Sequence, residues 1–173
     1  MLRMHRGEER AAETLWALFA LRLAVYARSL LPAGMESSAE DVVQGVFVRV
    51  LEMRRGSLRR VNDGAAFLFR MTRNGALNTG RGEVRERARR RSAAVGPAKL
   101  GIGEDARAVL AAVEQLGEEQ REVIVLRYFG GLTVDQVAEA LGARRGTVAS
   151  RGRLGVQRLR DVLGVDISEV CDG

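Results

Sequence analysis

Apolar residues recur at helical spacing along most of the chain, most clearly in the stretch 133–163, TVDQVAEALGARRGTVASRGRLGVQRLRDVL. One apolar stripe follows the i, i+3, i+4, i+7 pattern of a short amphipathic helix: Val134, Val137, Ala138 and Leu141. Thr133 precedes this stripe and Gln136 follows it by three residues, the spacing of a capping box. Gly142 is expected to end the helix.

A second helix is expected to start within 145–147, because Thr147 can cap it and Val148 opens a new stripe. The residues predicted to pack inward are Val148, Gly152, Gly155, Val156, Leu159, Val162 and Leu163. The side predicted to face solvent carries Ala149, Ser150, Arg153, Leu154, Gln157 and Arg160, flanked by Arg151 and Arg158. Two such helices joined by a tight turn form a helix-turn-helix, whose second helix can lie in the major groove of DNA. The same pattern also occurs in ordinary helical bundles, so that alternative stays open.

Three glycines fall inside this second helix, at Gly146, Gly152 and Gly155. Each glycine in a helix interior costs about 1 kcal/mol relative to alanine. We therefore expect another backbone to approach the helix closely at these positions.

The remaining periodic stretches also predict helices, and no convincing alternation of period two is present, so the predicted fold class is all-α. The expected helices cover 8–31, 38–52, 65–91, 109–116 and 118–130. The first of them should bury one broad face formed by Leu15, Leu18, Phe19, Leu23, Tyr26 and Leu30. Pro32 and Gly34 are expected to stop it.

The helix 38–52 is expected to be capped by Ser37 or Ser38, with acidic residues in its first turn. Its buried side is predicted to hold Val42, Val43, Val46, Phe47, Val50 and Leu51. Its outer side is predicted to show Asp41, Gln44, Arg49 and Glu52.

Glycine and arginine mark the segments between and after these helices. The stretch 56–64 is predicted to be a loop, and 81–91 holds six arginines and two glutamates, which predicts a projecting basic helix or a frayed tail. The stretch SAAVGPAKLGIG has three glycines, one proline and one charge, which is typical of a flexible linker. We therefore expect two small helical domains, 8–91 and 105–165, joined by a linker at 92–104 and followed by an acidic tail at 166–173.

The composition excludes several classes of protein. The 173 residues contain one cysteine and one histidine, Cys171 and His5, so an internal disulfide or a cysteine-histidine metal site is not expected. Arg22 and Arg28 interrupt the apolar run 15–31, which is too short to span a bilayer comfortably. The charged start of the chain lacks the features of a cleavable signal, so a cytoplasmic location is predicted.

The net charge of +6 is unevenly distributed, because residues 1–91 carry 18 basic and 10 acidic side chains. The second half carries 10 basic and 12 acidic side chains. A positive field concentrated in the first half favours a polyanion as partner through counterion release, although many basic runs are only solvated surface.

Three stretches together resemble a known family. They are AEDVVQGVFVRVLE at 39–52, AAFLFRMTRNGALNTGRGEVRERARR at 65–90, and QLGEEQREVIVLRYFGGLTVDQVAEALGARRGTVASRGR at 115–153. In this order and separation they resemble a bacterial sigma-70 family RNA polymerase sigma factor of the extracytoplasmic-function (ECF) group. The resemblance implies two helical domains, region two and region four, that direct promoter-specific transcription initiation.

The resemblance also implies partners and site residues. Region two would dock on the clamp helices of the largest subunit of core RNA polymerase through Asp41, Gln44, Arg49 and Glu52. It would recognise and melt the −10 promoter element with Phe67, Arg70, Arg73, Asn74, Asn78 and Arg81. Region four would read the −35 element as duplex with Arg145, Thr147, Ser150, Arg151, Arg153 and Leu154.

The chain departs from the usual family pattern at three of these places. Phe67 stands where tryptophan is usual, Ala149 where a basic residue is common, and Leu154 where many members have arginine. These differences affect which promoter sequence is read and leave the general role unchanged.

No paired carboxylates, phosphate-binding loop or activated nucleophile is evident, so neither catalysis nor a cofactor or metal is expected. Two other functions remain open. A helix-turn-helix regulator would bind an operator without acting as a sigma subunit, and a nucleic-acid-coating protein would bind regardless of sequence. The sequence also leaves open whether an anti-sigma factor holds the protein inactive.

Overall fold

The computed structural model is helical throughout the part that it describes, residues 9–32, 34–35, 37–89 and 104–164, apart from short connections. The first helix group contains α1 (Glu9–Leu30), α2 (Ser38–Glu52), α3 (Arg55–Leu58) and α4 (Gly64–Arg89). The second helix group contains α5 (Glu104–Glu114), α6 (Glu118–Ile124), η2 (Val125–Phe129), α7 (Val134–Leu141) and α8 (Arg145–Leu163). The π-helix η2 continues α6, and together they form the helix expected at 118–130. The all-α fold is confirmed.

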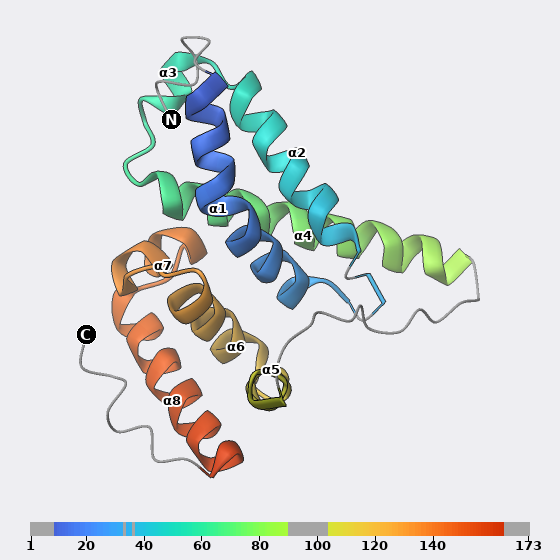
Figure 1. Cartoon of the computed structure of the whole chain (residues 1–173), viewed down its shortest axis with the longest axis vertical. Helices are drawn as coiled ribbons and strands as arrows, with labels where there is room; N and C mark the ends of the chain where they lie inside the picture. Colours follow the sequence, from blue (N-terminus) through green and yellow to red (C-terminus); the bar gives the residue numbers. More distant parts are fainter. Residues whose placement is uncertain (1–8, 33, 36, 90–103, 165–173) are drawn as a thin grey trace.

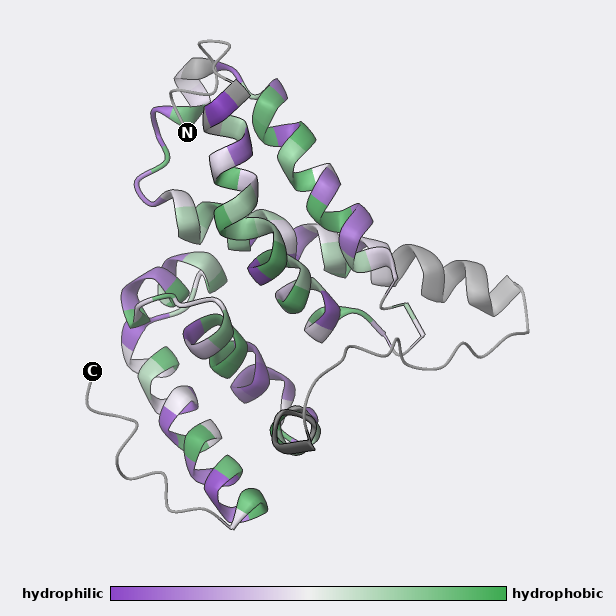
Figure 2. Cartoon of the chain, in the orientation of Figure 1, coloured by the Kyte–Doolittle hydropathy of each residue, from purple (hydrophilic) through white to green (hydrophobic). Residues whose placement is uncertain are grey.

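In the first helix group α1, α2 and α4 pack pairwise against one another, with α4 lying across the other two (Figure 1). Hydrophobic and hydrophilic residues alternate around α2 and α8, as amphipathic helices require (Figure 2). The buried residues that hold the first group together include Leu23, Tyr26, Val43, Val46, Phe47, Val50, Leu68 and Phe69. Two aromatic pairs add specific packing, since the rings of Trp16 and Phe47 lie 4.7 Å apart and those of Tyr26 and Phe69 5.5 Å apart.

Two residues predicted to be buried in this group are exposed. Leu18 is 59% exposed on α1 and Leu51 is 49% exposed on α2. Each lies at the edge of an apolar face that is wider than the neighbouring helices cover. The predicted burial of both side chains is therefore wrong.

The start of α2 lacks the side-chain cap that the sequence predicts. Ser37 has helical backbone angles (φ −65°, ψ −25°) and its side chain makes no capping hydrogen bond. An N-cap residue must be extended to aim its oxygen at the free amides, so Ser37 cannot cap. The N–H of Ser38 donates to the carbonyl of Met35 instead, at 2.9 Å. The loop predicted at 56–64 likewise contains most of the short helix α3.

The second helix group packs directly against the first. α7 contacts α4, while α6 and η2 contact α1. Buried residues of both groups, such as Tyr26, Phe69, Val123 and Leu126, belong to one continuous apolar cluster. The predicted linker 92–104 lies outside the described residues apart from its last position, as does the predicted tail 166–173.

The glycines of α8 show where it is closely approached. A Cβ added to Gly155 would lie 2.8 Å from Cγ1 of Ile124, and one added to Gly152 would lie 3.4 Å from Cγ1 of Val123. Side chains of α6, not another backbone, therefore approach Gly155 closely and Gly152 less closely, so the predicted approach of a backbone is wrong. At Gly146 no atom lies within 4 Å, so the prediction there is wrong.

Candidate nucleic-acid and polymerase interfaces

The helix-turn-helix is formed by α7 and α8, and its first helix begins as predicted. The N–H of Gln136 donates to Oγ1 of Thr133 at 3.2 Å, while the N–H of Thr133 donates to Oε1 of Gln136 at 2.8 Å. Gly142 ends α7 in the left-handed conformation, with φ 64°. The capping box and the glycine stop are confirmed.

The start of α8 is as expected, but Thr147 does not cap it. Arg144 occupies the N-cap position without a side-chain hydrogen bond, and α8 begins at Arg145. Thr147 lies inside the first turn with an exposed side chain. Its predicted capping role is therefore wrong.

The two sides of α8 divide as the sequence predicts. Val148, Gly155 and Leu159 are buried on the side of α8 that packs against the other helices of the second group. The predicted −35 residues on the outer side, Ser150, Arg153 and Leu154, are exposed, as is Gln157. Arg160 is the exception, because it is half-buried where an exposed side chain was predicted.

Two of the predicted −35 arginines already form ion pairs. Nε of Arg145 lies 2.8 Å from Oδ1 of Asp135, and both side chains are largely exposed. Arg151 pairs with Glu119 on α6. Exposed pairs such as that of Arg145 are weak, typically about 0.2–1 kcal/mol, so a DNA phosphate can compete for its guanidinium group. The Arg151 side chain is only 27% exposed, although its partner Glu119 is 70% exposed.

The predicted −10 residues divide between two sides of α4. At about 100° per residue, Phe67, Asn74 and Asn78 share one face, and Arg70 lies beside them. Arg70 and both asparagines are exposed, and the guanidinium of Arg70 lies 5.7 Å from the centre of the half-buried Phe67 ring. The backbone at Arg81 belongs to α4, which extends past α1 and α2 (Figure 1), but its side chain lies outside the described part of the structure.

Arg73 points away from this face, towards the second helix group. Its Nε donates to Oε1 of Glu122 on α6 at 2.7 Å, and the hydroxyl of Tyr26 donates to the same oxygen at 2.8 Å. The side chains of Arg73 and Glu122 are only 33% and 11% exposed. The hydrogen bond to Glu122 raises the pKa of Arg73, while burial and the charge of Glu122 raise the pKa of Tyr26 well above its usual value. Both donors therefore stay protonated, and one carboxylate joins the two helix groups.

A second polar contact joins α4 to α7 through Asp63. Oδ1 of Asp63 accepts the N–H of Ala66 at 2.8 Å, capping α4, and Oδ2 accepts Nε2 of Gln136 at 2.7 Å. The hydrogen bond from Gln136 lowers the pKa of Asp63 more than its partial burial raises it. Asp63 thus fixes the start of α4 and holds it to the helix-turn-helix.

Sequence reasoning missed Asp63 and Glu122. Asp63 directly precedes α4, and an aspartate before an apolar helix is a recognisable cap signal. Glu122 is the acidic residue next to the apolar run that follows it, which marks it as a polar group near the core. Neither signal identifies a partner, because Arg73 lies 49 residues from Glu122.

The predicted polymerase-binding residues of α2 are all exposed: Asp41, Gln44, Arg49 and Glu52. Two apolar side chains share their surface, since Val48 is 51% exposed and Leu51 is 49% exposed. Val48 falls outside the apolar repeat that α2 buries, and this break in periodicity is the feature of the sequence that could have predicted its exposure. The outer side of α2 is therefore an apolar strip with polar edges, which suits contact with another helix.

Within the described residues, no three His, Cys, Asp or Glu side chains are grouped to hold a metal ion. In that part of the chain, too, no helix is long and apolar enough to cross a membrane. Cys171 and His5 lie outside the described residues.

Comparisons with known proteins agree with this geometry. Residues 106–159 match the family model for region 4 of sigma-70. The ECF RNA polymerase sigma factor SigK of Mycolicibacterium vanbaalenii is 31% identical over 137 residues, which cover 73% of this chain and 69% of SigK. The chain belongs to the ECF family of RNA polymerase sigma factors. The predicted family is thereby confirmed.

A further relative of this sigma factor is SigE of Mycolicibacterium smegmatis, 33% identical over 162 residues, which cover 85% of this chain and 60% of SigE. The sigma factor RpoE of Bartonella quintana, solved in complex with the anti-sigma factor NepR, superposes with a TM-score of 0.69 at 27% identity. That match covers 89% of this chain and 97% of RpoE. CnrH, solved with the cytosolic domain of CnrY, gives a TM-score of 0.62 at 26% identity, covering 95% of this chain and 94% of CnrH.

Proposed function

We propose that this sigma factor binds core RNA polymerase and directs it to promoters by contacting a −10 and a −35 element. The observation that carries the proposal is the presence of two DNA-suited helix surfaces in one chain, on α4 and on the outer side of α8. We assign 8–91 to region two, 105–165 to region four and 92–104 to the linker between them. Acting with the polymerase, the protein works in the cytoplasm without catalysing a reaction itself.

The outer side of α8 reads the −35 element as duplex. Arg153 and Ser150 are exposed where a recognition helix meets base edges, and Arg145 and Thr147 lie in its first turn, near the phosphates. Arg151 contacts DNA after exchanging Glu119 for a phosphate. Leu154 offers an apolar contact to a thymine methyl group.

The exposed face of α4 binds the −10 element after it opens. Asn74 and Asn78 have amides that both donate to and accept from base edges, and Phe67 offers an aromatic surface backed by Arg70. Nε of Arg73 is held by Glu122, so parting of the two helix groups at that contact would release the whole guanidinium for a phosphate.

The outer side of α2 binds the clamp helices of the polymerase. Val48 and Leu51 supply apolar contact, and Asp41, Gln44, Arg49 and Glu52 surround it with polar groups. An anti-sigma factor is a further partner under this proposal, because RpoE, which covers most of this chain, was solved with one.

The proposal is tested by mixing the purified protein with core RNA polymerase that lacks any sigma subunit. We expect comigration with the core enzyme, lost on Val48→Asp because a carboxylate would be buried in the contact. Arg153→Glu is the matched control, since it should leave comigration intact while abolishing −35 duplex binding. A protein that never joins the core enzyme, yet binds an operator tightly alone, would contradict the proposal and support the regulator.

A further inference from the structure

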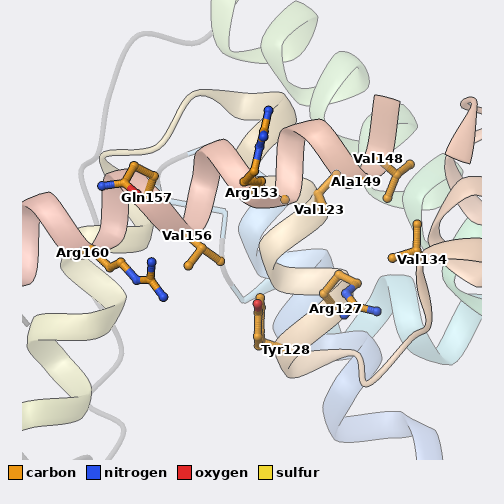
Figure 3. Close-up of a pocket in the computed structure, with 11 residues that line it drawn as sticks. Val123, Arg127, Tyr128, Val134, Val148, Ala149, Arg153, Val156, Gln157 and Arg160 are labelled. Carbon is orange, nitrogen blue, oxygen red and sulfur yellow. The ribbon is translucent and has the colours of Figure 1, made fainter. Parts of the chain in front are cut away.

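A groove lies between α8 on one side and α6 and η2 on the other, with a volume of about 360 Å³ (Figure 3). Its floor is apolar, formed by Val123, Val134, Val148 and Val156. Arginines and a tyrosine line its edges: Arg127, Arg153, Arg160 and Tyr128. No acidic residue is among the described residues that line it. The groove thus combines an apolar base with positive charge.

This combination favours an acidic peptide with interspersed apolar side chains. Duplex DNA would satisfy the arginines, but it has almost no aliphatic surface to place against four valines. Carboxylates can pair with the guanidinium groups while aliphatic side chains fill the floor. The volume is at the lower end of the range of about 300–1,000 Å³ for ligand pockets, which suits a few side chains.

The chain itself contains such a segment directly after α8. Residues 166–172 read DISEVCD, with acidic residues at every third position and no basic residue. Ile167 and Val170 each follow an acidic residue, so apolar and acidic side chains repeat together. The segment lies outside the described residues, and its chemistry complements that of the groove.

Chain length allows the segment to reach the groove. Val156 lies eight residues before Gly164, about 12 Å along the helix at 1.5 Å per residue. Six extended residues span about 20 Å, so residues 167–170 can lie over Val156 and Gly152. A short tether also gives the segment a high effective concentration at the groove.

We propose that the acidic segment 166–172 docks into this groove and there competes with duplex DNA for α8. Arg153 and Gln157 line the groove and also lie on the outer side of α8. A docked segment would therefore cover part of the surface proposed to read the −35 element. The competition rests on that proposed function, whereas the docking itself does not.

Docking is tested directly through Cys171, the single cysteine of the chain. A nitroxide attached to its sulfur in the full-length protein should broaden the amide signals of Val123 and Val134, which are distant from it in sequence. Replacing Asp166, Glu169 and Asp172 by their amides should remove this broadening. Signals at Val123 and Val134 that are unaffected by the label would overturn the proposal. The proposal would also be overturned if the broadening arose only between chains, when spin-labelled protein is mixed with unlabelled protein whose amides are observed. The segment in the groove would then belong to a second copy of the chain.

Competition is tested by the affinity of the full-length protein for a −35 duplex. If the segment occupies the groove nine-tenths of the time, its amide variant should bind about tenfold more tightly. The matched control is Glu114→Gln, Glu118→Gln and Glu139→Gln, which changes the net charge equally on exposed positions of the second helix group. Equal gains in the two variants would overturn the competition. Failure of the proposed function would appear differently, as no specific duplex binding by any variant while the amide broadening persists.

Discussion

α8 and α4 carry the two sets of side chains proposed to contact promoter DNA, yet they differ in how the rest of the molecule holds them. The outer side of α8 is exposed, and its ion pairs through Arg145 and Arg151 each involve a largely exposed carboxylate. On α4, Arg73 shares a largely buried carboxylate with Tyr26. The −35 surface is therefore accessible in this arrangement, whereas part of the −10 surface is bound to the second helix group.

This difference separates two steps that a sigma factor must perform. Reading a duplex requires an accessible helix, while holding opened DNA requires cationic groups at the place where strands separate. Under the proposed function Glu122 connects the two steps, because it holds Nε of Arg73 at the second helix group. This contact joins the two helix groups together with the hydrogen bond from Gln136 to Asp63 and the apolar cluster that both groups share.

The largest effect is expected from Glu122→Ala. The change leaves Tyr26 and Arg73 without their shared acceptor, and hydrogen bonds to charged groups contribute about 1.5–3 kcal/mol each. We expect the free energy of unfolding in urea to fall by about 2–3 kcal/mol, with the two helix groups moving apart. The control Glu139→Ala alters an exposed glutamate on α7 and should change stability by less than about 0.5 kcal/mol. Equal stability of the two variants would show that the shared carboxylate does not join the groups.

A smaller effect is expected from Asp63→Ala, which removes the cap of α4 and the hydrogen bond from Gln136. Loss of a helix cap costs about 1 kcal/mol, so unfolding near pH 7 should become easier by roughly that amount or slightly more.

The same variant carries a pH test. Because the folded protein lowers the pKa of Asp63 below 3.8, its contribution is present above the usual pKa and is lost as pH falls through the folded value. The stability difference between wild type and Asp63→Ala should therefore shrink below about pH 4. A difference that is constant from pH 7 to pH 3 would contradict this assignment.

The smallest effect on stability is expected from Arg145→Ala, which changes an exposed side chain of α8. Its ion pair with Asp135 is largely exposed on both partners, so stability should be nearly unchanged. Affinity for a −35 duplex should still fall, with a reduced dependence on salt, because one phosphate contact is lost. A large loss of stability would mean that Arg145 has a structural role.

Sequence alone predicted the parts of the molecule that depend on neighbouring residues along the chain. Thr133 and Gln136 form their capping box, and Gly142 ends α7, because each signal acts within one turn. Leu18 and Leu51 were wrongly placed in the core because burial at the edge of a helix depends on how far its neighbours extend.

The contacts that join the helix groups had no local signal sufficient to predict them. Glu122 meets Arg73 and Tyr26 across 49 and 96 residues, and Gln136 meets Asp63 across 73. The sequence indicated two separate domains, whereas in the structure the two helix groups pack together and Arg73 is paired across their contact.

The most direct test measures transcription starts by core RNA polymerase on a library of promoter fragments, with the wild-type protein, Arg73→Ala or Arg153→Ala. The proposal predicts specific starts only when the protein is present, on fragments sharing an upstream and a downstream element. Arg153→Ala should lose selection of the upstream element, and Arg73→Ala should reduce opening at the downstream one. Starts no more specific than those of core enzyme alone, or unchanged selection with both variants, would contradict it.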